Sequence, residues 1–89
     1  MKPAQQLALM DKIIRELDDL RNSQTSVLKK IAQIEADNIN LGSELLNDGL
    51  PGIHEEVDDA VQKITALVEP FTEQRNQFQQ DNPISEEEG

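Results

Sequence analysis

Apolar side chains recur at alternating steps of three and four residues through the first half of the chain. The steps continue without a slip for five heptads, and nine of the eleven positions are apolar. The positions are Met10, Ile13, Leu17, Leu20, Gln24, Val27, Ile31, Ile34, Asn38, Leu41 and Leu45. A sustained repeat of 3.5 residues keeps one seam toward a partner only if the helices supercoil left-handedly. The pattern therefore predicts one long coiled-coil helix over residues 3–48.

Two polar residues interrupt this seam. If Met10 is an a position and Ile13 a d position, Gln24 and Asn38 both fall at a. A buried Asn at a lowers stability but fixes register and oligomer number, because its amide needs a matching amide. We therefore expect either a register role for Asn38 or a partly wet seam at both polar positions.

Further apolar residues lie beside the seam, with Leu7, Ile14 and Leu28 at e and Leu9 at g. The apolar stripe is thus wider than a two-stranded coiled coil needs, especially before residue 30. A wide stripe favours a bundle of three or four helices over a bare dimer.

A second heptad pattern follows a cluster of turn-forming residues. The cluster is Asn47-Asp48-Gly49-Leu50-Pro51-Gly52, and it predicts a turn at 47–52. The second pattern consists of Val57, Val61, Ile64, Val68, Phe71, Arg75 and Phe78. It predicts a helix over 52–80, with Ala60 and Leu67 widening its stripe. Pro70 removes a hydrogen bond inside this helix, so we expect a kink near it, with a break into two helices as the alternative.

A turn this short folds the second helix back antiparallel on the first. A helix that ends at residue 80 would then reach only to about residue 20, which leaves the apolar cluster at residues 7–17 uncovered. The fold class predicted is all-α, an antiparallel helical hairpin over residues 1–80 that forms a coiled-coil or four-helix-bundle oligomer. The expected oligomer interface comprises Leu7, Met10, Ile13, Ile14, Leu17, Leu20, Val27, Ile31, Ile34, Asn38 and Leu41. The competing hypothesis is that this surface binds a different protein.

Composition narrows the function classes. The 89 residues include no Cys and a single His, so a disulfide framework, a cysteine zinc site and a thiol nucleophile are excluded. There is no glycine-rich phosphate loop, and no hydroxyl has a base at a recognisable spacing. The sequence therefore predicts a protein that is not an enzyme and holds no cofactor or metal.

The net charge of −10 argues against direct binding of nucleic acid or of a membrane surface through a basic face. No apolar run approaches the roughly 18 residues of a membrane span. The short apolar stretch near the N-terminus is broken by Asp11, so we expect no signal peptide and a cytoplasmic protein. The partners expected are a second copy of the chain and another protein.

Most of the acidity lies in the second half, where residues 49–89 hold 10 acidic and 2 basic side chains. Four acidic residues follow His54 within residues 55–59, and we interpret them as a solvated first turn of the helix rather than a metal site. Residues 81–89 are interpreted as a disordered acidic tail. Acidic side chains along a rigid helix also resemble a phosphate backbone. The alternative function is therefore a nucleic-acid-mimicking inhibitor of a basic protein. Its binding face would be Glu55, Glu56, Asp58, Asp59, Glu69 and Glu73, with the tail residues Glu86, Glu87 and Glu88.

Overall fold

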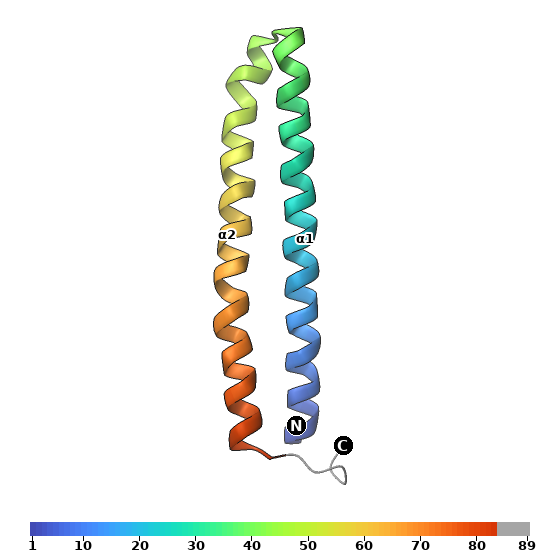
Figure 1. Cartoon of the computed structure of the whole chain (residues 1–89), viewed down its shortest axis with the longest axis vertical. Coiled ribbons are helices and arrows are strands. Elements are labelled where there is room, and N and C mark those ends of the chain that lie inside the picture. The colour runs from blue at the N-terminus through green and yellow to red at the C-terminus, as the bar shows by residue number, and fades with distance from the viewer. Residues whose placement is uncertain (84–89) are drawn as a thin grey trace.

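Two long antiparallel helices make up the computed structural model, which describes residues 1–83 (Figure 1). Helix α1 runs Pro3–Leu41 and helix α2 runs Glu44–Asp81. The molecule measures 64 × 17 × 16 Å, and no strand occurs in residues 1–83. The predicted all-α hairpin is confirmed. We call the end that carries the turn the tip, and the opposite end, where α1 begins and α2 finishes, the base.

The turn lies at Gly42 and Ser43, so the predicted turn at 47–52 is wrong, and so are the predicted end of the first helix at 48 and start of the second at 52. The predicted start at residue 3 is confirmed, and the predicted end at 80 differs from Asp81 by one residue. Gly42 adopts a left-handed conformation with φ of 72°, which costs glycine little, and its N–H donates to the carbonyl of Asn38 at 2.7 Å. Ser43 then caps α2, its side chain accepting from the N–H of Leu46 at 3.4 Å. A glycine stop followed at once by a serine start gives a tighter turn than the cluster five residues later.

Helix α2 runs through the residues that were expected to form the turn and through Pro70, where a kink, or alternatively a break, was expected. Gly49, Pro51 and Gly52 lie in its first three turns, and Pro70 lies well inside it. Each proline leaves one helical carbonyl without its usual N–H donor. Both proline side chains are exposed, as are Asn47 and Ala66, whose carbonyls are the ones left free. Water can therefore hydrogen-bond these carbonyls, and α2 continues through Pro70 rather than dividing there.

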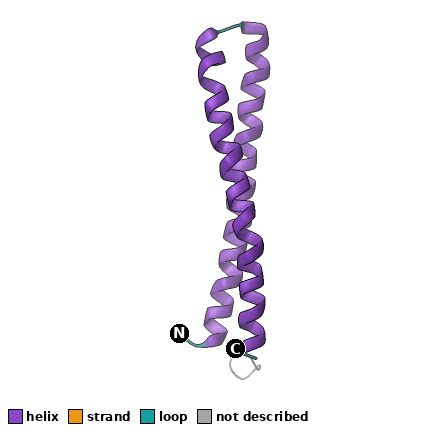
Figure 2. Ribbon diagram, turned by 90° about the vertical axis from the view of Figure 1, so that its left-hand side faces the viewer, coloured by secondary structure: helices purple, strands orange, loops and turns teal. Residues whose placement is uncertain are grey.

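The longer α2 reaches the base of the hairpin. Arg75 of α2 contacts Asp11 of α1, 64 residues away in sequence. The expectation that residues 7–17 lack intramolecular cover is therefore wrong. Within this segment the apolar side chains are half-buried, apart from the exposed Ala8 and Leu9. In the side view the helices cross near their middles, as two helices that wind around each other do (Figure 2).

Of the expected acidic tail, Asp81 closes α2, and Asn82 and Pro83 follow it. Residues 84–89 lie outside the described part of the chain.

Candidate functional site

The seam between the helices uses the a and e columns of the first heptad pattern, not the a and d columns. On α1 one run of half-buried and buried positions again steps by three and four residues. It consists of Leu7, Met10, Ile14, Leu17, Arg21, Gln24, Leu28, Ile31, Glu35 and Asn38. Further half-buried residues lie beside this run, namely Pro3, Ala4, Asp11, Ile13, Asp18 and Thr25. A single partner helix covers about two of the three apolar columns of α1. The third column, d, is therefore left at the surface.

The interior of the hairpin is thin. Ile31 and Leu50 are the only buried apolar side chains among residues 1–83, and Asn38 is the only buried polar one. A pair of helices has no central space that neighbouring side chains enclose on every side, so most seam residues stay partly open to water.

The d column forms a continuous exposed stripe along α1. Beyond the half-buried Ile13, its members Leu20, Val27, Ile34 and Leu41 are between 39% and 73% exposed. A second column lies on α2, where Ile53 and Leu67 are 51% and 56% exposed and Ala60 lies between them. We define the apolar face as these two columns with their neighbour at the base. It comprises Leu9, Ile13, Leu20, Val27, Ile34, Leu41, Ile53, Ala60 and Leu67.

Both columns lie on the same side of the hairpin. Each d residue of α1 immediately precedes an e residue of the seam, as Ile13 precedes Ile14. Each residue of the α2 column likewise precedes a seam residue, as Ala60 precedes Val61. In antiparallel helices, columns displaced in the same rotational sense from the seam point to one common side. The apolar face is therefore a single surface that spans both helices.

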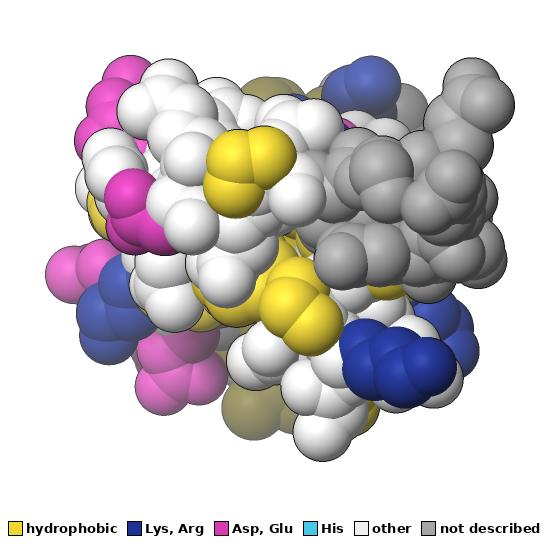
Figure 3. Space-filling view, turned by 90° about the horizontal axis from the view of Figure 1, so that it is seen from below, with side chains coloured by type: hydrophobic (Ala, Val, Ile, Leu, Met, Phe, Trp, Pro, Cys, Tyr) yellow, Lys and Arg dark blue, Asp and Glu magenta, His cyan; other side chains and the backbone are white. Residues whose placement is uncertain are grey.

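At the base this surface is hollowed into a groove. Leu9, Met10 and Ile13 of α1 line it together with Phe71 of α2, and Met1 and Gln6 close its end. The end view shows hydrophobic side chains between the helices and also at the surface, beside charged groups (Figure 3). The groove confirms that side chains of the two helices meet on this side of the seam.

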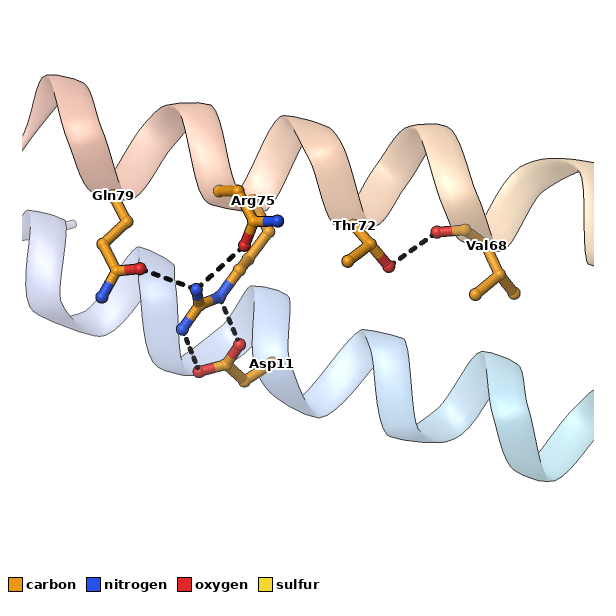
Figure 4. Close-up of polar contacts among 6 residues, drawn as sticks. Asp11, Val68, Thr72, Arg75 and Gln79 are labelled. Carbon is orange, nitrogen blue, oxygen red and sulfur yellow. Dashed lines mark hydrogen bonds and ion pairs between the residues drawn. The ribbon is translucent and has the colours of Figure 1, made fainter.

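The opposite side of the seam is closed by polar pairs between the helices. Near the base, Arg75 donates from Nε to Asp11 Oδ1 at 2.7 Å and from an Nη to Oδ2 at 3.4 Å (Figure 4). Its other Nη donates to Asn76 and Gln79. The hydrogen bond to Asp11 raises the pKa of the guanidinium, with the negative charge of Asp11 acting in the same direction. Because both hydrogen bonds to Asp11 join α2 to α1, the Arg75 guanidinium holds the two helices at a fixed level relative to each other near the base.

Nearer the tip, Nδ1 of His54 lies 2.5 Å from Oε1 of Glu35. Both side chains are partly exposed, at 41% and 33%. Neither this pair nor the Asp11–Arg75 pair was predicted. Each pair joins an acidic residue of one helix to a basic residue of the other, which the sequence could have indicated. These residues face each other, however, only once the turn is placed at Gly42.

The tip is held by the amide of Asn38, which is 3% exposed. Its Nδ2 donates to the carbonyl of Ser43 at 3.1 Å and to Oδ1 of Asn47 at 2.8 Å. Its Oδ1 accepts from the N–H of Ser43 at 2.9 Å. The matching amide that was expected from a second chain is supplied by Asn47 of the same chain. Asn38 therefore belongs to the turn and not to an exposed interface.

The predicted interface residues thus divide between two surfaces. Six of the eleven lie in the intramolecular seam: Leu7, Met10, Ile14, Leu17, Ile31 and Asn38. The other five, Ile13, Leu20, Val27, Ile34 and Leu41, lie on the apolar face. The contribution of α2 to this face, chiefly Ile53, was missed, although its spacing from Ala60 and Leu67 is a heptad.

The acidic residues of the alternative function lie along α2. Glu55, Glu56, Asp58 and Asp59 line a shallow polar depression with Gly52 and Gln62. Asp58 accepts from Gln62 at 2.9 Å, and Asp59 pairs with Lys63 at 3.1 Å. Glu69 and Glu73 are exposed further along the helix.

Residues 1–83 contain no group of three or more His, Cys, Asp or Glu side chains arranged to hold a metal ion. In the same part of the chain, neither helix is long and apolar enough to cross a membrane. No protein family matches this chain, and neither curated proteins nor solved structures give a match.

Proposed function

We propose that this protein works by binding other proteins, as a small assembly, scaffold or adaptor protein, and that it first binds a second copy of itself. The observation that supports this proposal is the apolar face. Its large aliphatic side chains repeat for five heptads on α1 and are accompanied by a second column on α2. Such continuous exposed apolar surface is typical of an interaction site in a folded protein.

The exposed area of the hairpin is large enough for a second copy of the chain to bind. The chain exposes 6662 Å². A compact monomer of the same mass exposes about 5,200 Å², so the hairpin carries an excess of roughly 1,400 Å². Each partner in a standard interface buries about 800 Å², and obligate homodimers bury more. A second hairpin laid on the apolar face would form a four-helix bundle and enclose the thin interior between four helices.

The test compares substitutions on and off this face. We expect the wild-type chain to have twice the single-chain mass by light scattering at tens of micromolar. We expect the pair Leu20→Lys and Val27→Lys to reduce it to one chain, because four lysines would be desolvated in each dimer. Ile39→Lys is the matched control, since Ile39 is 82% exposed but lies on the opposite side of the seam.

Circular dichroism checks that each variant remains helical. A wild-type chain of single mass at these concentrations would contradict self-association, and so would loss of the dimer in the Ile39 variant alone.

The second candidate is the acidic inhibitor of a nucleic-acid-binding protein. It is favoured by one observation, that α2 presents Glu55, Glu56, Asp58 and Asp59 together around one depression. Reversal of these four residues to Lys should then abolish binding to a basic DNA-binding protein, while the dimer mass stays unchanged. Affinity should also fall steeply as salt rises, because screening weakens exposed charges. Binding that survives either change would exclude this candidate.

A further inference from the structure

We propose that the second copy docks antiparallel, with the tip of one hairpin against the base of the other. The two-fold axis would pass Val27 of α1 and Ala60 of α2. This inference rests on the self-association proposed above and adds its orientation. Three features of the hairpin support it: the spacing of the apolar columns, the distribution of charge along the molecule, and the groove at the base.

The two apolar columns are centred at the same level of the hairpin. Val27 is the middle residue of the column that runs from Ile13 to Leu41, and Ala60 is the middle of the column on α2. The cross-helix contacts Asp11–Arg75 and Glu35–His54 place Val27 at the level of about residue 61. One two-fold axis perpendicular to the helices can therefore pass through the middle of both columns at once.

This axis pairs every residue of the columns with an apolar residue of the second copy. On α1 it sets Ile13 against Leu41, Leu20 against Ile34, and Val27 against its own copy. On α2 it sets Ile53 against Leu67, and Ala60 against its own copy. Such pairs lie opposite one another because helix rise is constant along both columns.

A parallel dimer would fit the middle of the face equally well but not its end. There α1 of one copy would lie against α2 of the other, and Val27 would meet Ala60. At the base, however, Ile13 would meet the exposed Gln74, which continues the α2 column. Antiparallel docking gives Ile13 an apolar partner instead.

Charge also favours the antiparallel orientation. All eight Lys and Arg residues lie in residues 1–30 and 63–75, and residues 31–62, the part of the hairpin that includes the tip, have none. Residues 31–62 carry eight Asp and Glu, whereas the remaining described residues carry seven and are close to neutral. Parallel docking would place two strongly acidic tips side by side. Antiparallel docking places each tip beside the base of the other copy, where Lys2, Lys12 and Arg15 are exposed.

The groove at the base provides the matching shape. It holds about 260 Å³, and aliphatic or aromatic side chains line most of it. At the other end of the same face, Leu41 is 73% exposed. In the antiparallel dimer Leu41 lies at Ile13 of the second copy, beside Leu9, Met10 and Phe71. A protruding residue at the tip would thus enter a hollow at the base, once at each end.

Spin labels placed away from the face test the orientation. Ala8 and Ala36 are exposed f positions four heptads apart, about 42 Å along the helix, and the chain has no native Cys. We expect the labelled Ala8→Cys dimer to give a distance of about 55 Å or more by pulsed dipolar spectroscopy, because Ala8 lies far from the axis at Val27. The labelled Ala36→Cys dimer should give roughly 30–40 Å, because Ala36 lies closer to the axis. Refolding the two labelled chains together should add a shorter distance of roughly 20–30 Å, because residue 36 of one copy lies level with residue 18 of the other, only about 15 Å along the helix from residue 8.

The contrary results are distinct. Short distances in both single-label samples, with a long distance only after mixing, would overturn the antiparallel orientation and leave self-association intact. A sample without any dipolar signal between chains would overturn the self-association itself. Ile39→Lys in the same labelled chains is the control, and it should leave all distances unchanged.

Discussion

At the scale of single residues, the amide of Asn38 connects the last turn of α1 with the first turn of α2. Three hydrogen bonds use both of its polar atoms, and Asn47 and Ser43 supply the partners. The heptad pattern correctly marks Asn38 as a buried polar position but does not say which chain completes it. A partner nine residues away is close enough to pair with Asn38 only because Gly42 reverses the chain.

Asn38→Ala should lower the free energy of unfolding by about 1–3 kcal/mol, because it leaves the Ser43 N–H and the Asn47 amide without their partner in a closed site. Urea unfolding at one fixed protein concentration measures the change. Asn40→Ala is the control, since Asn40 is exposed and its substitution should stay within about 0.5 kcal/mol. Equal losses in the two variants would show that Asn38 has no special role in the turn.

At the scale of elements, α2 shows tertiary contacts overriding local preference. The cluster at 47–52 has the composition of a turn, and its glycines and proline disfavour helix by several kcal/mol in isolation. Leu50 lies among these residues and is one of the two buried apolar side chains among residues 1–83. Burial of Leu50 against α1 stabilises this segment as part of the helix, whereas its helix propensity alone would not.

Pro51→Ala should stabilise the hairpin by up to about 3 kcal/mol, because Pro51 is the eighth residue of α2 and not its first. Thermal unfolding at fixed concentration measures the gain. Pro3→Ala is the control, since Pro3 opens α1, where proline is favourable, and it should bring no gain. If Pro51→Ala were as neutral as Pro3→Ala, residue 51 would stand at a helix start, and the turn would lie where the composition suggested.

At the scale of the whole molecule, the two sides of the hairpin differ in kind. One side carries the cross-helix pairs Asp11–Arg75 and Glu35–His54, which are satisfied within the chain. The other carries the apolar face, most of whose side chains are exposed in residues 1–83. Along the length, an acidic tip stands opposite a nearly neutral base. This asymmetry favours one side and one orientation for binding, and we propose that a second copy binds on that side and in that orientation.

Much of the fold could be predicted from the sequence, and less of the candidate site. The heptads around Ile31 and Ile64 indicated both helices, and the expectation of a short turn indicated their antiparallel packing, although the turn lies at Gly42 and not at 47–52. The width of the stripe indicated more apolar surface than one partner helix covers. Which apolar residues stay exposed could not be predicted, because Leu17 and Leu20 are equally apolar. Only the position of α2 decides that Leu17 is half-buried and Leu20 is exposed.

Two amphipathic helices follow from the sequence, because spacing at 3.5 residues is a property of each segment alone. Which apolar column of α1 is covered follows only from the packing of α2 against it. That choice depends on the level and rotation of α2, which Gly42, Asn38 and the Asp11–Arg75 pair set together. Residues far apart in sequence meet in these contacts, and no local pattern records which of several similar columns such contacts will bury.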